Sequence, residues 1–130
     1  VFCPEQPVFS DEAGLTLGGG ASLRALKQWA AEFLPPLLSV WAERFGLTYR
    51  KVRITAARSR WGSCTSAKTI SLSCYLMLVP SHLIDYVILH ELAHTREMNH
   101  GPRFWELLDS MTAGQALRFR GELRRFRTSF

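Results

Sequence analysis

Apolar residues recur every three to four positions in the first third of the chain, the spacing that places them on one face of an α-helix. The pattern starts near Ser22, a residue type that caps helix N-termini, and continues to Pro35 and Pro36. Because proline lacks the N–H that a helix interior needs, this pair predicts a break. A second helix is expected over residues 37–45, with Gly46 as its stop signal.

Alternation of apolar and polar residues takes over in the middle of the chain, and a period of two predicts β-strands. It covers residues 49–57 and 69–77, which we expect to pair with each other as a hairpin. Between them, residues 61–64 have the sequence Trp-Gly-Ser-Cys and are interpreted as a turn-like element.

Helical periodicity returns in the last third of the chain. It predicts a largely apolar core helix over residues 81–97, a helix over 102–111 that begins with its proline, and a basic helix over 115–126. Asn99 is expected to reverse the chain in a left-handed conformation. The order of helices, small sheet and helices predicts an α+β fold, with a small antiparallel sheet or hairpin packed on the helix at 81–97 and helices flanking it.

The length of 130 residues fits one domain with its own core. Residues 1–20 are rich in proline, glycine and small residues, and we expect them to be a flexible lead segment or the remnant of an upstream part, with the domain at 21–130. No signal peptide and no apolar run of roughly 20 residues is visible, so no membrane segment is expected. Three cysteines without a C-x-x-C pair favour a reducing, cytoplasmic location.

The formal net charge is +5, and much of it lies near the C-terminus. The arginines of this stretch are Arg118, Arg120, Arg124, Arg125 and Arg127. Such a segment can bind the phosphates of nucleic acid, and it can equally be a solvated helix face. Both interpretations stay open at this point.

Residues 90–94 read H-E-x-x-H and carry the strongest chemical signal. On a helix His90 and His94 lie one turn apart on the same face, so both imidazoles can reach one metal ion, and His100 follows as a third nitrogen ligand. Histidine and glutamate are rarely buried without a partner, so a metal explains them better than a structural role does. Three neutral imidazoles favour Zn²⁺, and Glu91 is placed to act as general base on a metal-activated water that hydrolyses a peptide bond.

Other residues of the site are left as alternatives. A structural metal would need a fourth protein ligand, for which Cys64 or Cys74 are the candidates. Trp61 either packs in the core, the favoured interpretation, or lines a substrate groove. The candidates to stabilise the oxyanion are Tyr75, Tyr86 and Arg103. The candidates to orient a ligating imidazole are Glu97, Glu106 and Asp109.

Several separated motifs, taken together, resemble the YgjP-like metallopeptidase domain. They are residues 60–64 (R-W-G-S-C), 70–72 (I-S-L), Pro80, 86–94 (Y-V-I-L-H-E-L-A-H) and 99–105 (N-H-G-P-R-F-W). The resemblance covers about residues 23–126, with two departures: Ser73 stands where the family often has asparagine, and the family's N-terminal half is reduced.

This resemblance implies a zincin-type fold, zinc held by His90, His94 and His100, and Glu91 as the catalytic glutamate. The family is similar in turn to the SprT-like proteases, which act on proteins attached to DNA. The predicted function is therefore a zinc metallopeptidase acting on a peptide or protein. The alternative is a DNA-associated protein, either a protease recruited by DNA or a nucleic-acid-binding module with a structural zinc.

Overall fold

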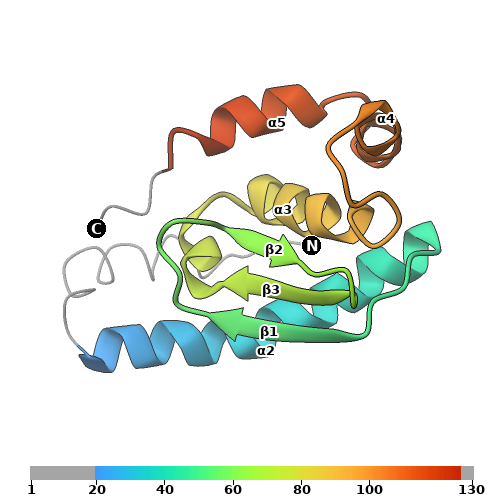
Figure 1. The fold of residues 1–130 in the computed structure, drawn as a ribbon. Coiled ribbons are helices and arrows are strands. Elements are labelled where there is room, and N and C mark those ends of the chain that lie inside the picture. Colours follow the sequence, from blue (N-terminus) through green and yellow to red (C-terminus); the bar gives the residue numbers. More distant parts are fainter. Residues whose placement is uncertain (1–19, 127–130) are drawn as a thin grey trace.

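The computed structural model describes residues 20–126 (Figure 1), so the predicted lead segment at 1–20 lies outside the described residues except for Gly20. The described elements are α2 (Gly20–Phe45), β1 (Lys51–Thr55), β2 (Gly62–Cys64), β3 (Thr69–Ser73), the 3₁₀ helix η1 (Cys74–Leu78), α3 (Ser81–Ala93), α4 (Pro102–Met111) and α5 (Ala116–Leu123). This arrangement is the predicted α+β fold. Ser22, expected as a helix cap, instead lies within α2, which begins at Gly20.

The sheet is mixed. The antiparallel hairpin predicted between residues 49–57 and 69–77 is wrong, because these segments contribute β1 and β3, which pair in parallel. The strand order is β1-β3-β2, with β1 parallel to β3 and β2 antiparallel to it. The segment interpreted as a turn at residues 61–64 contributes β2, which is too short for its alternation to be recognised. Strand β2 pairs with one edge of β3, and β1 pairs with the other edge in parallel. The strand predicted over 69–77 also ends early, where Ser73 caps η1 by accepting a hydrogen bond from the Tyr75 N–H.

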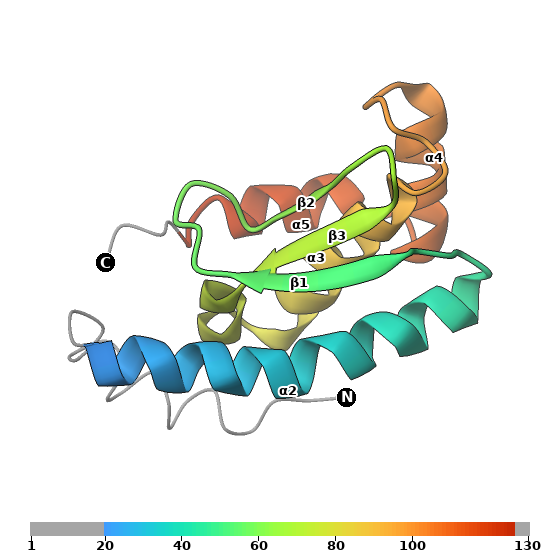
Figure 2. The same cartoon turned by 60° about the horizontal axis from the view of Figure 1, so that its bottom comes forward.

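One face of the sheet carries the core, and helices α2 and α3 cover it (Figure 2). Ile70 and Leu72 of β3 are fully buried on this side, whereas Lys51 and Arg53 of β1 are exposed. Helices α4 and α5 pack against α3 in turn. The H-E-x-x-H helix is therefore the central element, since it contacts β2, β3 and the other three described helices.

Helix α2 runs unbroken through Pro35 and Pro36, where a break was predicted. The two prolines deprive the carbonyls of Ala31 and Glu32 of their helical donors. Both of these residues are exposed, so water can satisfy the two carbonyls. The buried positions continue past the prolines without interruption: Leu26, Ala30, Leu34, Leu37 and Leu38. Tertiary packing of this stripe overrides the local preference for a break.

The chain after α3 turns more tightly than predicted. Helix α3 ends at Ala93 rather than near Glu97, and the Glu97 N–H donates to the Ala93 carbonyl at 2.9 Å. Asn99 does not adopt a positive φ; among the described residues other than glycine only Lys68 and Ala113 do. Pro102 is the first residue of α4, as predicted. Helix α5 (Ala116–Leu123) is shorter than the predicted 115–126.

No helix in the described part of the chain is both long and apolar enough to cross a membrane.

Candidate metal centre

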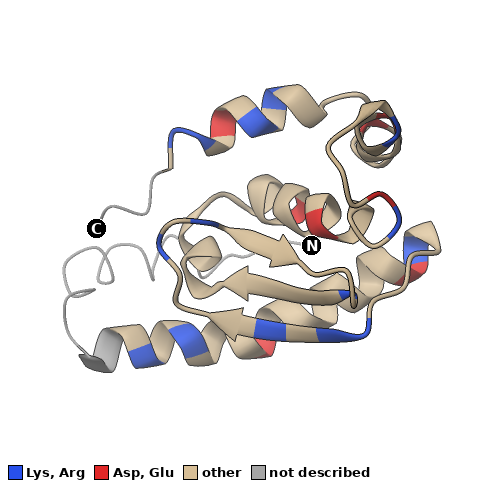
Figure 3. Cartoon of the chain, viewed as in Figure 1, with Lys and Arg blue, Asp and Glu red and all other residues tan. Residues whose placement is uncertain are grey.

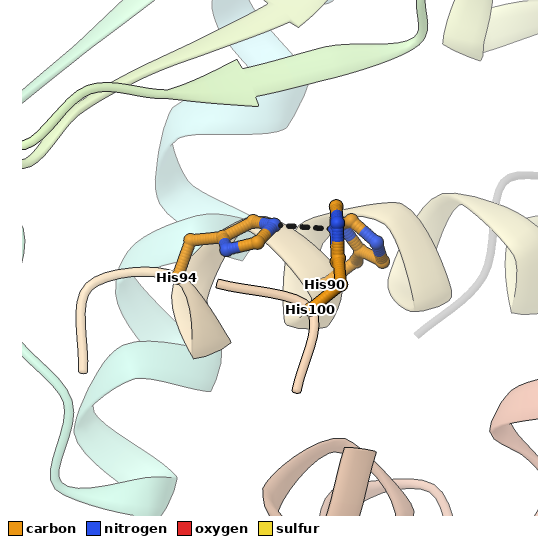
Figure 4. A group of neighbouring side chains, drawn as sticks. All are labelled: His90, His94 and His100. Atoms are coloured by element: carbon orange, nitrogen blue, oxygen red, sulfur yellow. Dashed lines mark hydrogen bonds between the residues drawn. The ribbon is translucent and has the colours of Figure 1, made fainter. Parts of the chain in front are cut away.

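Three histidines converge at the C-terminal end of α3. His90 lies in the last turn of that helix, His94 is its C-terminal cap, and His100 comes from the loop that leads into α4. One ring nitrogen of each lies within 4.8 Å of the corresponding nitrogens of the other two. Figure 4 shows the rings directed toward one another, with Nε2 of His94 3.0 Å from Nε2 of His100.

The donor set fits a divalent metal ion. A tetrahedral zinc with Zn–N distances of about 2.0–2.1 Å separates its nitrogen ligands by roughly 3.3 Å, close to the spacing of His94 and His100. Nδ1 of His94 lies 3.1 Å from the carbonyl oxygen of Glu97. An Nδ1–H that donates to this carbonyl leaves the Nε2 lone pair free for a metal. Glu97 was a candidate partner for a ligating histidine, and it acts here through its backbone.

Electrostatics keep two of the three rings neutral. Burial lowers the pKa of His94, and partial desolvation together with the neighbouring His94 and His90 rings lowers the pKa of His100. A ring with a lowered pKa stays deprotonated at neutral pH, and only a neutral imidazole can bind a metal.

Phe104 forms an aromatic floor under the three histidines. It is fully buried, and its ring centroid lies 4.4 Å from that of His94, 5.0 Å from His90 and 4.8 Å from His100. The contact with His94 is stacked, and the other two are edge-on. Because Phe104 belongs to α4, packing of that helix fixes the loop that presents His100.

Glu91 lies beside the histidines and is 5% exposed. Its Oε2 is 3.3 Å from Nδ1 of His90. Gly62 of β2 lies directly against it: a Cβ at position 62 would come within 3.1 Å of Glu91 Cγ and 3.1 Å of the Ser71 carbonyl oxygen. Only a turn was predicted at Gly62, because no local signal in the sequence reveals that β2 passes beside the Glu91 side chain.

A cleft opens beside these groups. A cavity of about 630 Å³ is lined by His90, Glu91 and His100 and also by Trp61 and Tyr86. Trp61 is half-buried and packs against the core as well. Trp61 thus packs against the core, the favoured interpretation, and it also lines the cleft.

The two cysteines among the described residues, Cys64 and Cys74, lie outside the histidine group. Cys64 lines a smaller hollow of about 270 Å³ next to the histidines, but its Sγ is not among the clustered ligand atoms and donates to the Thr65 carbonyl at 3.5 Å. Burial raises the pKa of the Cys64 thiol to about 11, so the thiol is protonated at neutral pH. Cys74 is fully buried in the hydrophobic core. Neither residue supplies a fourth ligand in this arrangement.

Tyr86 is the only one of the three oxyanion candidates that lines the described cleft. Burial raises its pKa to about 12, which keeps the phenol protonated as a donor. Tyr75 is buried beside Arg58, and Arg103 is exposed on α4. Of the remaining candidate imidazole partners, Asp109 accepts a hydrogen bond from the Ala116 N–H and Glu106 is exposed.

Comparison with known proteins identifies the family of this chain. The model of the YgjP-like metallopeptidase domain matches residues 18–125. The chain belongs to this family. It is also similar in structure to the crystal structure of the metallopeptidase zymogen of Pyrococcus abyssi abylysin, with a TM-score of 0.60 and 22% identity over 68% of this chain and 89% of that one. A search of curated proteins gave no significant match.

Membership in the family makes this a metallopeptidase domain. The abylysin likeness, at its low sequence identity, speaks for a shared fold. A metallopeptidase requires a metal ion, and the three clustered histidines could hold one.

Proposed function

We propose that this domain is a zinc-dependent peptidase in which His90, His94 and His100 hold the metal and Glu91 is the general base. One observation carries the proposal: three ring nitrogens converge within 4.8 Å of one another, and two of these histidines, His90 and His100, line a cleft together with Glu91. Three donors leave a tetrahedral ion with a free position, the arrangement of a catalytic zinc, whereas a structural zinc has four protein ligands.

Each residue has a separate task in this proposal. His90, His94 and His100 would hold a divalent ion, which would supply the Lewis acidity that acidifies a water molecule and polarises a peptide carbonyl. Glu91 takes the proton of the attacking water at its carboxylate and delivers it to the leaving amine nitrogen. Its burial and its contact with Gly62 hold the carboxylate in one place for both transfers. The protonated Tyr86 hydroxyl is the proposed hydrogen-bond donor to the developing oxyanion.

Metal dependence tests the proposal. The chain is stripped with a chelator, reloaded with zinc, and assayed for bound metal and for cleavage of casein. We expect about one zinc per chain and cleavage only in the loaded form. In a His100→Ala variant we expect metal affinity to fall by roughly 100-fold or more, because the remaining two imidazoles cannot hold the ion alone. His100 is exposed, so its replacement leaves the core intact.

His82 offers the matched control. It is also exposed, lies outside the histidine group and pairs with Glu122 at 2.6 Å. His82→Ala should keep both the metal and the activity. Loss of metal from both variants, or full retention in both, contradicts the assigned ligands. A fully zinc-loaded chain that cleaves neither casein nor a peptide library contradicts the proposed activity.

A further inference from the structure

The cleft beside Glu91 extends far beyond the histidines. The cavity of about 630 Å³ continues into a second one of about 420 Å³. The two share five lining residues: Ser59, Arg60, Trp61, Leu123 and Arg124. They therefore form one continuous groove, with the segment before β2 as one wall and α5 as the other. One end lies at Glu91 and the other at Phe126.

Four arginines line this groove, and three of them, Arg58, Arg60 and Arg124, line the end away from the histidines, whereas Arg120 lines the cavity that also holds His90 and His100. Arg58 and Arg60 come from the segment before β2, Arg120 comes from α5, and Arg124 is the C-terminal cap of α5. All four are exposed. Figure 3 shows these two segments, far apart in sequence, both carrying positive charge. The groove thus brings together positive charges that lie roughly 60 residues apart in the sequence.

The charges of these arginines are not neutralised within the part of the chain that the structure describes. None of the four forms an ion pair there, whereas the neighbouring Arg118 pairs with Glu122 at 3.3 Å. Arg58 lies 5.8 Å from the ring centre of Tyr75, and Arg120 lies 5.8 Å from that of Trp105. Such contacts orient a guanidinium but leave its charge in place.

Acidic residues are nearly excluded from the groove. Among the residues that line its two cavities, Glu91 is the single carboxylate, and it lies at the histidine end. A groove with charge of one sign attracts ligands of the other sign and concentrates them at the site. Arginine is also the side chain whose planar fork matches a carboxylate with two parallel hydrogen bonds.

We infer that the arginine end of the groove selects peptide substrates that carry aspartate or glutamate a few residues from the scissile bond, on one side of it. This inference rests on the proposed peptidase function, which requires the occupant to present a peptide bond at Glu91. The apolar side chains of Trp61, Leu123 and Phe126 line the same end, so the favoured peptide places apolar residues beside its acidic ones. An extended peptide spans about 3.3 Å per residue, so several of its residues fit along the groove.

Matched peptides test the selection. One scissile sequence carries a Glu-Glu pair, a Gln-Gln pair or a Lys-Lys pair on one side of the cleaved bond, and a second set carries the same pairs on the other side. We expect kcat/KM to follow Glu > Gln > Lys for one set only. The Glu peptide should exceed the Gln peptide by roughly tenfold at low ionic strength, and added salt should reduce this ratio. Equal rates for all three pairs, or equal preference on both sides, overturn the inference.

Charge variants separate the groove from general electrostatics. Arg60→Gln with Arg124→Gln, which removes two arginines from the end of the groove away from the histidines, should lower the Glu/Gln ratio of kcat/KM to about one. The control double variant, Arg24→Gln with Lys27→Gln, removes the same charge from exposed positions of α2 outside the groove and should leave the ratio unchanged. A ratio that survives in the groove variant, or that falls equally in the control, contradicts the role of these arginines.

Binding distinguishes failure of this inference from failure of the peptidase proposal. If the zinc-loaded wild type cleaves no peptide, the peptidase proposal has failed, and binding to the inactive Glu91→Gln variant is measured by fluorescence anisotropy with labelled Glu and Gln peptides. Tighter binding of the Glu peptide that depends on Arg60 and Arg124 still supports selection of acidic peptides. Absence of such binding, or tighter binding of a single-stranded oligonucleotide by the same arginines, overturns it.

Discussion

Phe104 and Gly62 shape the candidate site although neither carries a catalytic group. Phe104 contacts all three histidine rings, so the aromatic floor sets their orientation before any metal binds. Gly62 lets β2 pass close to the Glu91 side chain, because any larger residue would meet both that side chain and the Ser71 carbonyl. The geometry of the site therefore depends on neighbours from α4 and β2 as much as on α3.

A methyl group at position 62 should disturb Glu91 directly. The added Cβ would lie 3.1 Å from Glu91 Cγ and 3.3 Å from its Oε2, so the carboxylate has to move. A displaced catalytic group costs about 10²-fold in rate. We expect Gly62→Ala to lower kcat by roughly that factor, with little change in KM and with metal content unchanged.

Gly121→Ala is the control for this measurement, because nothing lies within 4 Å of a Cβ at that position of α5. It should retain wild-type activity. Wild-type kcat in the Gly62→Ala variant would show that Glu91 tolerates the displacement or is not the base.

At the scale of secondary structure, the features that were predicted correctly are those set by residues close together in the sequence. The apolar run before His90 predicted α3, and proline at a first helical position predicted where α4 begins at Pro102. The one-turn spacing of His90 and His94 likewise brought both rings to one face. These features depend on residues only a few positions apart.

Features set by distant residues escaped prediction. The strand β2 is three residues long and is defined only by its pairing with β3. The parallel pairing of β1 with β3 likewise joins residues that lie far apart in the sequence. The arginine groove arises only when α5 packs next to the segment before β2. None of these leaves a periodic pattern in the sequence.

The continuity of α2 has a measurable cost. Pro36 is exposed within the helix and offers no N–H to the Glu32 carbonyl. Pro36→Ala restores this donor without opening a cavity. Proline in a helix interior is about 3 kcal/mol less favourable than alanine, and the stiffer unfolded chain recovers about 1 kcal/mol of this. We expect the free energy of unfolding, measured with urea, to rise by about 1–2 kcal/mol.

Pro102→Ala provides the contrast, because proline at the first position of a helix loses no hydrogen bond. It should leave stability unchanged or slightly lower. A destabilised Pro36→Ala variant would mean that α2 requires the proline geometry, against the account of packing overriding a local break.

At the scale of the whole molecule, the candidate metal centre joins α3 to the loop before α4, and α3 contacts the other three described α-helices. Metal binding to the folded state should therefore raise global stability. A ligand at 100 times its Kd contributes about 2.7 kcal/mol when it binds only the folded chain. We expect zinc to raise the thermal midpoint of the wild type and of His82→Ala, and a chelator to reverse the gain. A similar rise in His100→Ala would place the zinc elsewhere.

In the proposed mechanism, Glu91 performs proton transfer in a site whose metal is held by the three histidines. The most direct test compares the wild type with Glu91→Gln, which keeps the size of the side chain and removes its basicity, by mass spectrometry of bound metal together with cleavage of casein. If Glu91 is the general base, we expect about one zinc in each protein and cleavage by the wild type alone. Cleavage by the zinc-loaded variant at the wild-type rate would contradict it.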